Sequence, residues 1–126
     1  MKASFVGILG GAALVSGALV GLTTVAEAAA PKARVTVTIK AEGVDLSGRV
    51  KSRNPSLCAA NRKVKVYKVI NGENHLFATD TTDEGPAPYE WSTGNTGQEG
   101  TFFAKVSAKP GCRADVSPTI TAVRND

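Results

Sequence analysis

After Pro31 the apolar residues of this chain recur at every second position, and this period constrains its fold more than any other feature. A β-strand directs successive side chains to opposite faces, so a period of two indicates strands that are buried on one side. The three- or four-residue spacing of an amphipathic helix does not appear in this part of the sequence. We therefore predict an all-β domain.

Seven alternating runs follow one another, separated by turn-forming residues. Their apolar positions are Val35, Val37 and Ile39; Val44, Leu46 and Val50, with Gly48 in phase; Val64 and Val66; Leu76 and Ala78; Tyr89 and Trp91; Phe102, Ala104 and Val106; and Val116, Ile120 and Ala122, with Pro118 in phase. Seven short strands at this spacing indicate a single seven-stranded antiparallel sandwich of immunoglobulin-like or prealbumin-like type.

One turn and one strand residue allow more specific predictions. Asn71-Gly72 predicts a type I′ hairpin, because that turn needs positive φ at both positions. Pro118 has no backbone N–H to donate, so the last strand should be an edge strand or be kinked there.

Residues 1–28 have the composition of a signal helix. Lys2 precedes an uncharged apolar run, which ends at the small-x-small triplet Ala26-Glu27-Ala28. This pattern predicts cleavage after Ala28, a disordered linker over 29–33 and a sandwich domain over 34–124. The product would be a secreted, extracellular protein that has no membrane segment after cleavage. An uncleaved anchor is the alternative, because an apolar run of roughly 20 residues can span a bilayer.

The two cysteines flank strands that should be neighbours. Cys58 precedes the third predicted strand, and Cys112 follows the sixth. In an immunoglobulin-like order these strands are antiparallel neighbours, so the start of one lies beside the end of the other. A pair of cysteines in an exported chain is most simply a disulfide. We therefore predict a Cys58–Cys112 disulfide at one end of the sandwich.

Several segments, taken in order, resemble a known group of domains. They are Gly48-Arg49-Val50, Cys58, Arg62-Lys63-Val64-Lys65-Val66-Tyr67, Thr79-Asp80, Trp91-Ser92-Thr93, Gly100-Thr101-Phe102-Phe103-Ala104-Lys105-Val106 and Cys112. The pattern covers residues 35–122 and resembles small secreted bacterial proteins of unknown function, which look like relatives of carboxypeptidase-regulatory-like, or transthyretin-like, β-sandwich domains. The resemblance implies a structural, adhesive or ligand-presenting module, and it supplies no catalytic residue.

The net charge of +4 is unevenly distributed along the chain. Residues 49–68 include basic side chains and no acidic one, whereas residues 69–100 include acidic side chains and no basic one. Alternation places four of the basic residues on outward faces of the second and third strands: Arg49, Lys51, Lys63 and Lys65. These strands belong to different sheets of an immunoglobulin-like order, so the four need not form one patch.

This charge pattern has two interpretations. The basic and acidic segments can solvate each other, or the four basic residues can contact an anionic envelope polymer, such as a teichoic acid or a polysaccharide. Nucleic acid is not expected as a partner, because the predicted compartment is extracellular and few exposed aromatic residues accompany the basic ones.

The remaining candidate residues form no recognisable active site. His75 is the only histidine, it follows the predicted hairpin turn, and no Gly-x-Ser-x-Gly elbow accompanies it. Asp80, Asp83 and Glu84 are closely spaced oxygen ligands, which indicate either a solvated turn or a calcium site. We predict no catalytic residue, no cofactor and no other metal site.

The aromatic residues divide between the core and the surface. Trp91 and Phe102 have the phase of core residues, whereas Phe103 has the opposite phase. On paired strands Phe103 should lie beside Tyr67, either as simple cross-strand packing or as a small apolar patch for a partner.

These features together predict a secreted, non-enzymatic module with a binding or structural role at the cell envelope or outside the cell. An envelope polysaccharide or another secreted protein is the expected partner. A small exported enzyme or enzyme inhibitor is the alternative function.

Overall fold

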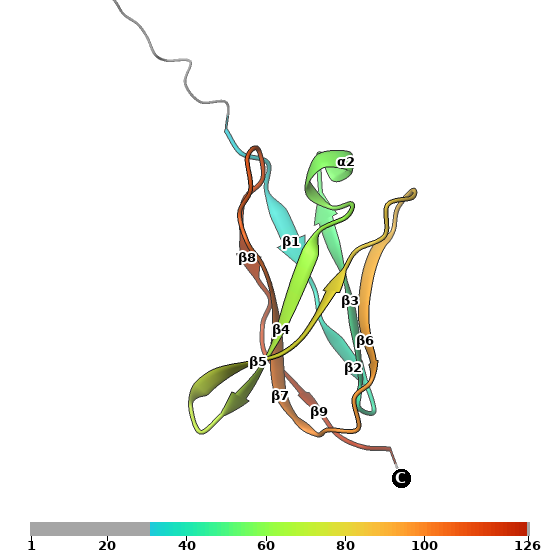
Figure 1. The fold of residues 1–126 in the computed structure, drawn as a ribbon, viewed down its shortest axis with the longest axis vertical. Coiled ribbons are helices and arrows are strands. Elements are labelled where there is room, and N and C mark those ends of the chain that lie inside the picture. Colours follow the sequence, from blue (N-terminus) through green and yellow to red (C-terminus); the bar gives the residue numbers. More distant parts are fainter. Residues whose placement is uncertain (1–30, 126) are drawn as a thin grey trace, which may run out of the picture. The chain divides into compact units, whose positions relative to one another are not determined.

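The computed structural model describes residues 31–125, which form two antiparallel sheets packed face to face (Figure 1). The four-stranded sheet contains β1 (Val35–Val37), β2 (Lys40–Glu42), β3 (Asp45–Ser52) and β6 (Tyr89–Asn95). The five-stranded sheet contains β4 (Lys63–Ile70), β5 (Glu73–Thr81), β7 (Gly100–Val106), β8 (Asp115–Val116) and β9 (Ile120–Ala122). The predicted all-β sandwich is confirmed at this level.

The structure has more strands than the seven predicted, because two of the predicted runs are interrupted. The first run is divided into β1 and β2, which pair with opposite ends of β3. At the break, Arg49 N donates to Thr38 Oγ1 (2.9 Å), while the Thr38 carbonyl accepts from Trp91 Nε1 (3.1 Å). The last run is divided into β8 and β9 around Pro118, which cannot continue a hydrogen-bond ladder.

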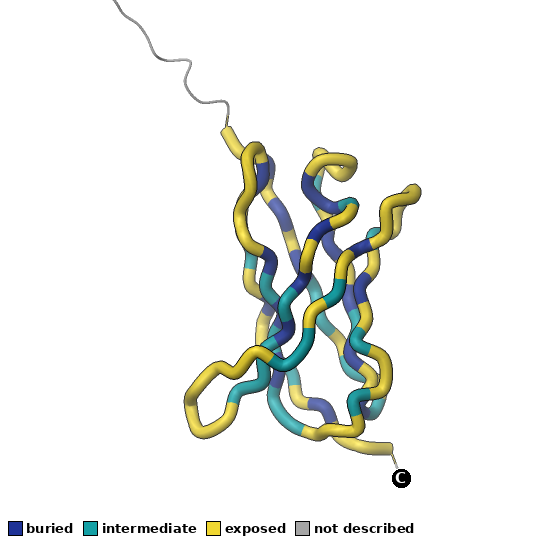
Figure 2. The backbone as a smooth tube through the Cα atoms, in the orientation of Figure 1, coloured by how far each residue is buried: buried dark blue, intermediate teal, exposed yellow. Residues whose placement is uncertain are grey.

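The core lies between the sheets and follows the predicted alternation (Figure 2). Trp91 and Phe102 are 1% and 0% exposed, in agreement with their phase. The buried residues of the hydrophobic core cluster are Ala33, Val35, Val37, Leu46, Val50, Cys58, Ala59, Val64, Val66, Trp91, Phe102, Ala104, Val106, Cys112 and Ala122. Burial of this apolar area is the main force that holds the two sheets together.

The prediction that Val116 faces the core was wrong. β8 pairs Val116 with Lys105, a residue on the outer side of β7, and Val116 is 54% exposed. The next residue, Ser117, is buried instead, and its Oγ accepts a hydrogen bond from Ala104 N (2.8 Å). The interruption at Pro118 changes the phase between β8 and β9, and an uninterrupted period of two cannot show this.

The hairpin of β4 and β5 turns at Asn71-Gly72, where φ is 53° and 78°. Both values are positive, as the predicted type I′ turn requires. The register shifts between Val66 and Tyr67, whose partners are Ala78 and Leu76, so Phe77 is the extra residue of a β-bulge. Phe77 packs against Phe102, with ring centroids 5.0 Å apart. This contact is not predicted by a period of two, because a bulge moves a residue out of that period.

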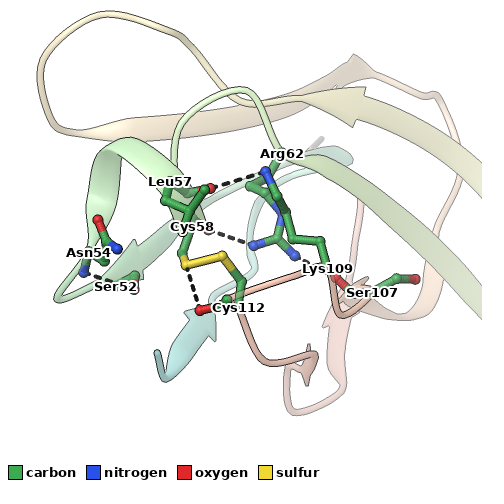
Figure 3. Close-up of a disulfide and its surroundings, with 9 residues drawn as sticks. Ser52, Asn54, Leu57, Cys58, Arg62, Ser107, Lys109 and Cys112 are labelled. Atoms are coloured by element: carbon green, nitrogen blue, oxygen red, sulfur yellow. Dashed lines mark hydrogen bonds between the residues drawn. A yellow bond between two sulfur atoms is a disulfide. The ribbon is translucent and has the colours of Figure 1, made fainter. Parts of the chain in front are cut away.

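A disulfide joins Cys58 to Cys112 at one end of the sandwich, with a Cα–Cα distance of 5.5 Å (Figure 3). Cys58 ends α2 (Pro55–Cys58), a four-residue helix too short to produce a helical period in the sequence. Cys112 follows β7, and β7 is the antiparallel neighbour of β4. The predicted bridge between the third and sixth runs is therefore confirmed.

Arg62 reinforces the same end of the molecule (Figure 3). Its side chain is buried, with Nη1 donating to the Cys58 carbonyl (2.7 Å) and Nη2 donating to the Ser107 carbonyl. Desolvation by burial lowers the pKa of Arg62 from its ordinary value. The guanidinium thus connects α2 to the chain that leaves β7, and two carbonyl oxygens stabilise its charge.

On each open side of the sandwich, an aspartate of one sheet accepts a hydrogen bond from a backbone N–H of the other sheet. On one side Asp115 of β8 accepts from Val37 N of β1 (2.8 Å). On the other side Asp80 of β5 accepts from Ser92 N of β6 (2.7 Å). All four residues lie on edge strands, whose outward N–H groups have no ladder partner. These two hydrogen bonds therefore fasten the sheets to each other at both margins.

Replacing Asp115 with alanine should lower the free energy of unfolding by about 1–2 kcal/mol, because a charge-assisted hydrogen bond is lost and the N–H of buried Val37 is left unpaired. The loss for Asp80→Ala should be smaller, because Ser92 is exposed and water can hydrate its N–H. The losses for Asp115→Ala and Asp80→Ala should add in the double variant, because the two sites lie at opposite margins. Urea denaturation measures the effect. Asp83→Ala, at an exposed aspartate, is the control and should change stability by less than about 0.5 kcal/mol.

At the amino-terminal side, Ala33 is buried and forms a bridge with Cys112. Ala33, which was expected in the linker over 29–33, therefore contacts the sandwich. The predicted signal peptide and its cleavage site lie outside the described residues. Within residues 31–125, no helix has the length and apolar character needed to cross a membrane.

Candidate functional site

The outer surface of the five-stranded sheet carries a group of residues that we name the lysine–aromatic face. It consists of Lys65 and Tyr67 on β4, Phe103 and Lys105 on β7, and Val116 on β8. On β4 and β7 the alternate residues are buried in the core, and Val116 pairs with the outward Lys105, so these five side chains are directed away from the core. The period of two that builds the core thus also builds this face.

Tyr67 and Phe103 are the centre of the lysine–aromatic face. The two residues are direct partners in the β4–β7 register. Their rings are stacked, with centroids 5.2 Å apart and an interplanar angle of 16°. Both residues are partly exposed, so the stack presents aromatic surface to the solvent. The predicted position of Phe103 beside Tyr67 is therefore confirmed.

Lys65 and Lys105 are also direct partners in this register. Like charges placed opposite each other on antiparallel strands are destabilising, by roughly 0.2–1 kcal/mol. Within the described chain no carboxylate lies within 4.0 Å of either ammonium group. The fold itself does not compensate this pair of charges.

A shallow hollow of about 340 Å³ lies over the lysine–aromatic face. Its lining combines aromatic, amide, ammonium and apolar groups: Tyr67, Asn74, Phe103, Lys105 and Val116. Asn74 comes from β5, where it is the partner of Val69. A few polar groups around an apolar and aromatic floor are the usual composition of a ligand site.

The four basic residues predicted to contact a polymer do not form one surface. Arg49 and Lys51 lie on β3 of the four-stranded sheet, whereas Lys63 and Lys65 lie on β4 of the other. Arg49 forms an ion pair with Glu90 of the adjacent strand, at 3.4 Å. That pair joins the basic and acidic segments in the way that mutual solvation predicts.

Lys105 is the functional candidate that the sequence analysis missed. It lies between the apolar residues Ala104 and Val106, so its outward direction could be predicted from the sequence. Its position opposite Lys65 is implied by the expected pairing of Tyr67 with Phe103, because in an antiparallel ladder that pairing makes Lys105 the partner of Lys65. Charge counts along the chain also missed it, because Lys105 lies 40 positions beyond Lys65.

The other predicted candidates are separated in space or already engaged. His75 is exposed on β5, with Nε2 3.7 Å from Glu73 Oε1. Asp80 accepts the hydrogen bond from Ser92 N, while Asp83 and Glu84 are exposed in the following loop. In residues 31–125 no three His, Cys, Asp or Glu side chains are grouped so that they could hold a metal ion.

A larger hollow of about 640 Å³ is lined by residues of β3 and β6, by the stretch between β1 and β2, and by Asp80 and Asp83. It is lined by residues of both charge signs, including Arg49, Glu90 and Asp80. Arg49 and Glu90 are paired with each other, and Asp80 is bonded to β6. Lys40 and Asp83 also line this hollow, so its charges are of both signs, whereas Lys65 and Lys105 place two charges of one sign opposite each other.

The chain matches no protein-family model and no curated protein. Function is then inferred from the chemistry of the surface, because a sandwich fold alone does not specify an activity. In the part of the chain that the structure describes, the lysine–aromatic face joins uncompensated charge to exposed aromatic area and a hollow.

Proposed function

We propose that this protein is an exported, non-enzymatic binding module that holds its ligand on the lysine–aromatic face. The Lys65–Lys105 pair is the observation that carries the proposal. A fold that opposes two lysines on neighbouring strands loses stability unless something anionic lies between or above them. The stacked rings beside them add apolar area, which contributes to binding when it is covered.

We also infer that the sandwich is of the immunoglobulin-like type with seven strands. β1 and β2 lie along one edge of β3, and β8 and β9 lie along one edge of β7. If each of these pairs counts as one strand, three strands face four, within the range of immunoglobulin-like sandwiches. A prealbumin-like order is the alternative.

Export is supported by the Cys58–Cys112 disulfide together with the predicted signal peptide. Structural disulfides persist in oxidising compartments and are rare in the cytosol. The expected site of action is the cell envelope or the extracellular medium, where anionic polymers and other secreted proteins are available as partners.

Lys65→Glu tests the proposal, because it should change stability and binding in opposite directions. A glutamate opposite Lys105 replaces a repulsive pair with an attractive one, so the free energy of unfolding should rise by roughly 0.2–1 kcal/mol. Retention of the protein on envelope material from the producing cell should fall by about tenfold at low salt. Urea denaturation and a sedimentation assay measure the two effects.

Lys51→Glu is the matched control. Lys51 is exposed on the other sheet, opposite Thr36, so the same change of net charge occurs away from the lysine–aromatic face. It should reduce retention by less than about twofold, since Lys51 lies on the other sheet and would not contact a ligand held on the lysine–aromatic face. Equal losses for the two variants, or no loss for Lys65→Glu, would contradict the proposed binding face.

A further inference from the structure

The lysine–aromatic face contains more than a charge patch, and its other groups narrow the chemistry of the ligand. Two ammonium groups attract any polyanion. The hollow beside them also has a floor of aromatic and apolar carbon, from Tyr67, Phe103 and Val116. A phosphate chain has no apolar surface with which to cover that floor. A ligand that uses the whole hollow must carry both negative charge and an apolar face.

The aromatic floor is preformed. Each ring is fixed by its stacking against the other and by the β4–β7 ladder beneath it. A fixed ring loses little conformational entropy when a ligand covers it. A pyranose ring has an apolar C–H face, and such a face suits an aromatic surface of this kind.

Asn74 adds a polar group at the margin of the hollow. Its side-chain amide both donates and accepts hydrogen bonds, which are the two functions that sugar hydroxyls offer in return. Asn74 is exposed, and its side chain forms no hydrogen bond within the described residues. The amide is therefore available to a ligand.

Lys65 and Lys105 supply the charge next to this floor. As direct partners on antiparallel strands, they present two donors within reach of one carboxylate. Lys105 lines the hollow itself, so an anion held there lies beside the aromatic rings. Negative charge and an apolar ring face are thus required at adjacent positions of the same ligand.

From this arrangement we infer that the ligand is an acidic polysaccharide, with a sugar ring over Tyr67 and Phe103 and its carboxylate against Lys65 and Lys105. The inference rests on the proposed function and specifies its ligand. Carboxylated pyranose units combine the ring, the hydroxyls and the negative charge in one residue of a polymer.

The test uses the exported protein and four defined probes at equal low salt. Polygalacturonate supplies rings and carboxylates, its full methyl ester supplies the rings without the charge, polyphosphate supplies charge without rings, and phosphatidylglycerol vesicles supply an anionic lipid surface. We expect polygalacturonate to bind at least about fivefold more tightly than each other probe, compared per charge for the polyanions. Isothermal calorimetry measures the affinities.

Variants of the face separate the contribution of the rings from that of the charge. Phe103→Leu keeps an apolar side chain and removes the ring, so polygalacturonate should bind about fivefold more weakly while polyphosphate is unchanged. Lys105→Gln should weaken the binding of both. Asn74→Ala should weaken the binding of polygalacturonate and leave that of polyphosphate unchanged. Thermal unfolding of each variant establishes that it is folded before its affinity is compared.

Several results would overturn the inference. Equal binding of polyphosphate, unaffected by Phe103→Leu, would show that charge alone is recognised. Preference for the vesicles would assign the face to a membrane surface. Polygalacturonate affinity that is the same in wild type and in all three variants would also refute an acidic polysaccharide at this site. The absence of binding to any probe would refute it too. The proposed function has its own test, because loss of envelope retention in Lys65→Glu does not depend on which probe binds.

Discussion

Gly48→Ala should destabilise the sandwich by roughly 3 kcal/mol or more, which is a large effect for one added methyl group. A Cβ built on Gly48 would lie 1.9 Å from the Thr38 carbonyl oxygen and 2.8 Å from Trp91 Nε1. Trp91 Nε1 donates a hydrogen bond to the Thr38 carbonyl oxygen at 3.1 Å, so neither group can move without breaking that hydrogen bond. The chain at Thr38 would have to separate from β3, with loss of the ladder beside it.

The matched control for this prediction is Gly85→Ala. Gly85 is in an exposed loop, and a Cβ there meets no atom within 4 Å. Its effect on the urea midpoint should be within about 0.5 kcal/mol in free energy. If Gly48→Ala were equally mild, the close approach of Thr38 and Trp91 over β3 would be wrong.

The double variant Cys58→Ala/Cys112→Ala should lose about 4 kcal/mol of stability. The two cysteines are 54 positions apart, and opening a loop of that length returns considerable entropy to the unfolded chain. Since small domains are stable by only about 5–15 kcal/mol, the variant should unfold at a much lower urea concentration. Both sulfur atoms are in the buried core, so their removal also leaves a small cavity.

Reduction of the wild-type protein supplies the control. Wild type in excess reductant under unfolding conditions should approach the stability of the double variant, because both lack the cross-link. The double variant itself should be insensitive to the reductant. A loss below about 1 kcal/mol would indicate that the contacts of Arg62 and α2 hold this end of the sandwich without the bridge.

Much of the fold could be predicted from local pattern. The phases of Val64, Val66, Trp91 and Phe102 followed directly from alternation, and all four are buried. The type I′ turn at Asn71-Gly72 followed from the rarity of positive φ in other residues. Local pattern failed where the backbone leaves its regular period, at the bulge that places Phe77 against Phe102 and at the break that turns Val116 outward.

The candidate site could be predicted only in part. Lys65 was identified as an outward basic residue, and Tyr67 was expected beside Phe103. Arg49 was expected on a different sheet from Lys65, and it does lie there, where it pairs with Glu90. Lys105 completes the face, because strand register brings together residues that are far apart along the chain.

Three features follow from the order of residues alone: the chain alternates, its alternate residues form a core, and its two cysteines lie at the ends of neighbouring strands. The folded arrangement is needed to establish the register that opposes Lys65 to Lys105, the hydrogen bonds of Asp80 and Asp115 at the two margins, and the close approach that requires glycine at position 48. The two groups of features differ in the range of the interactions that produce them. Alternation is a property of consecutive residues, whereas register, edge closure and close backbone approach depend on where distant strands meet.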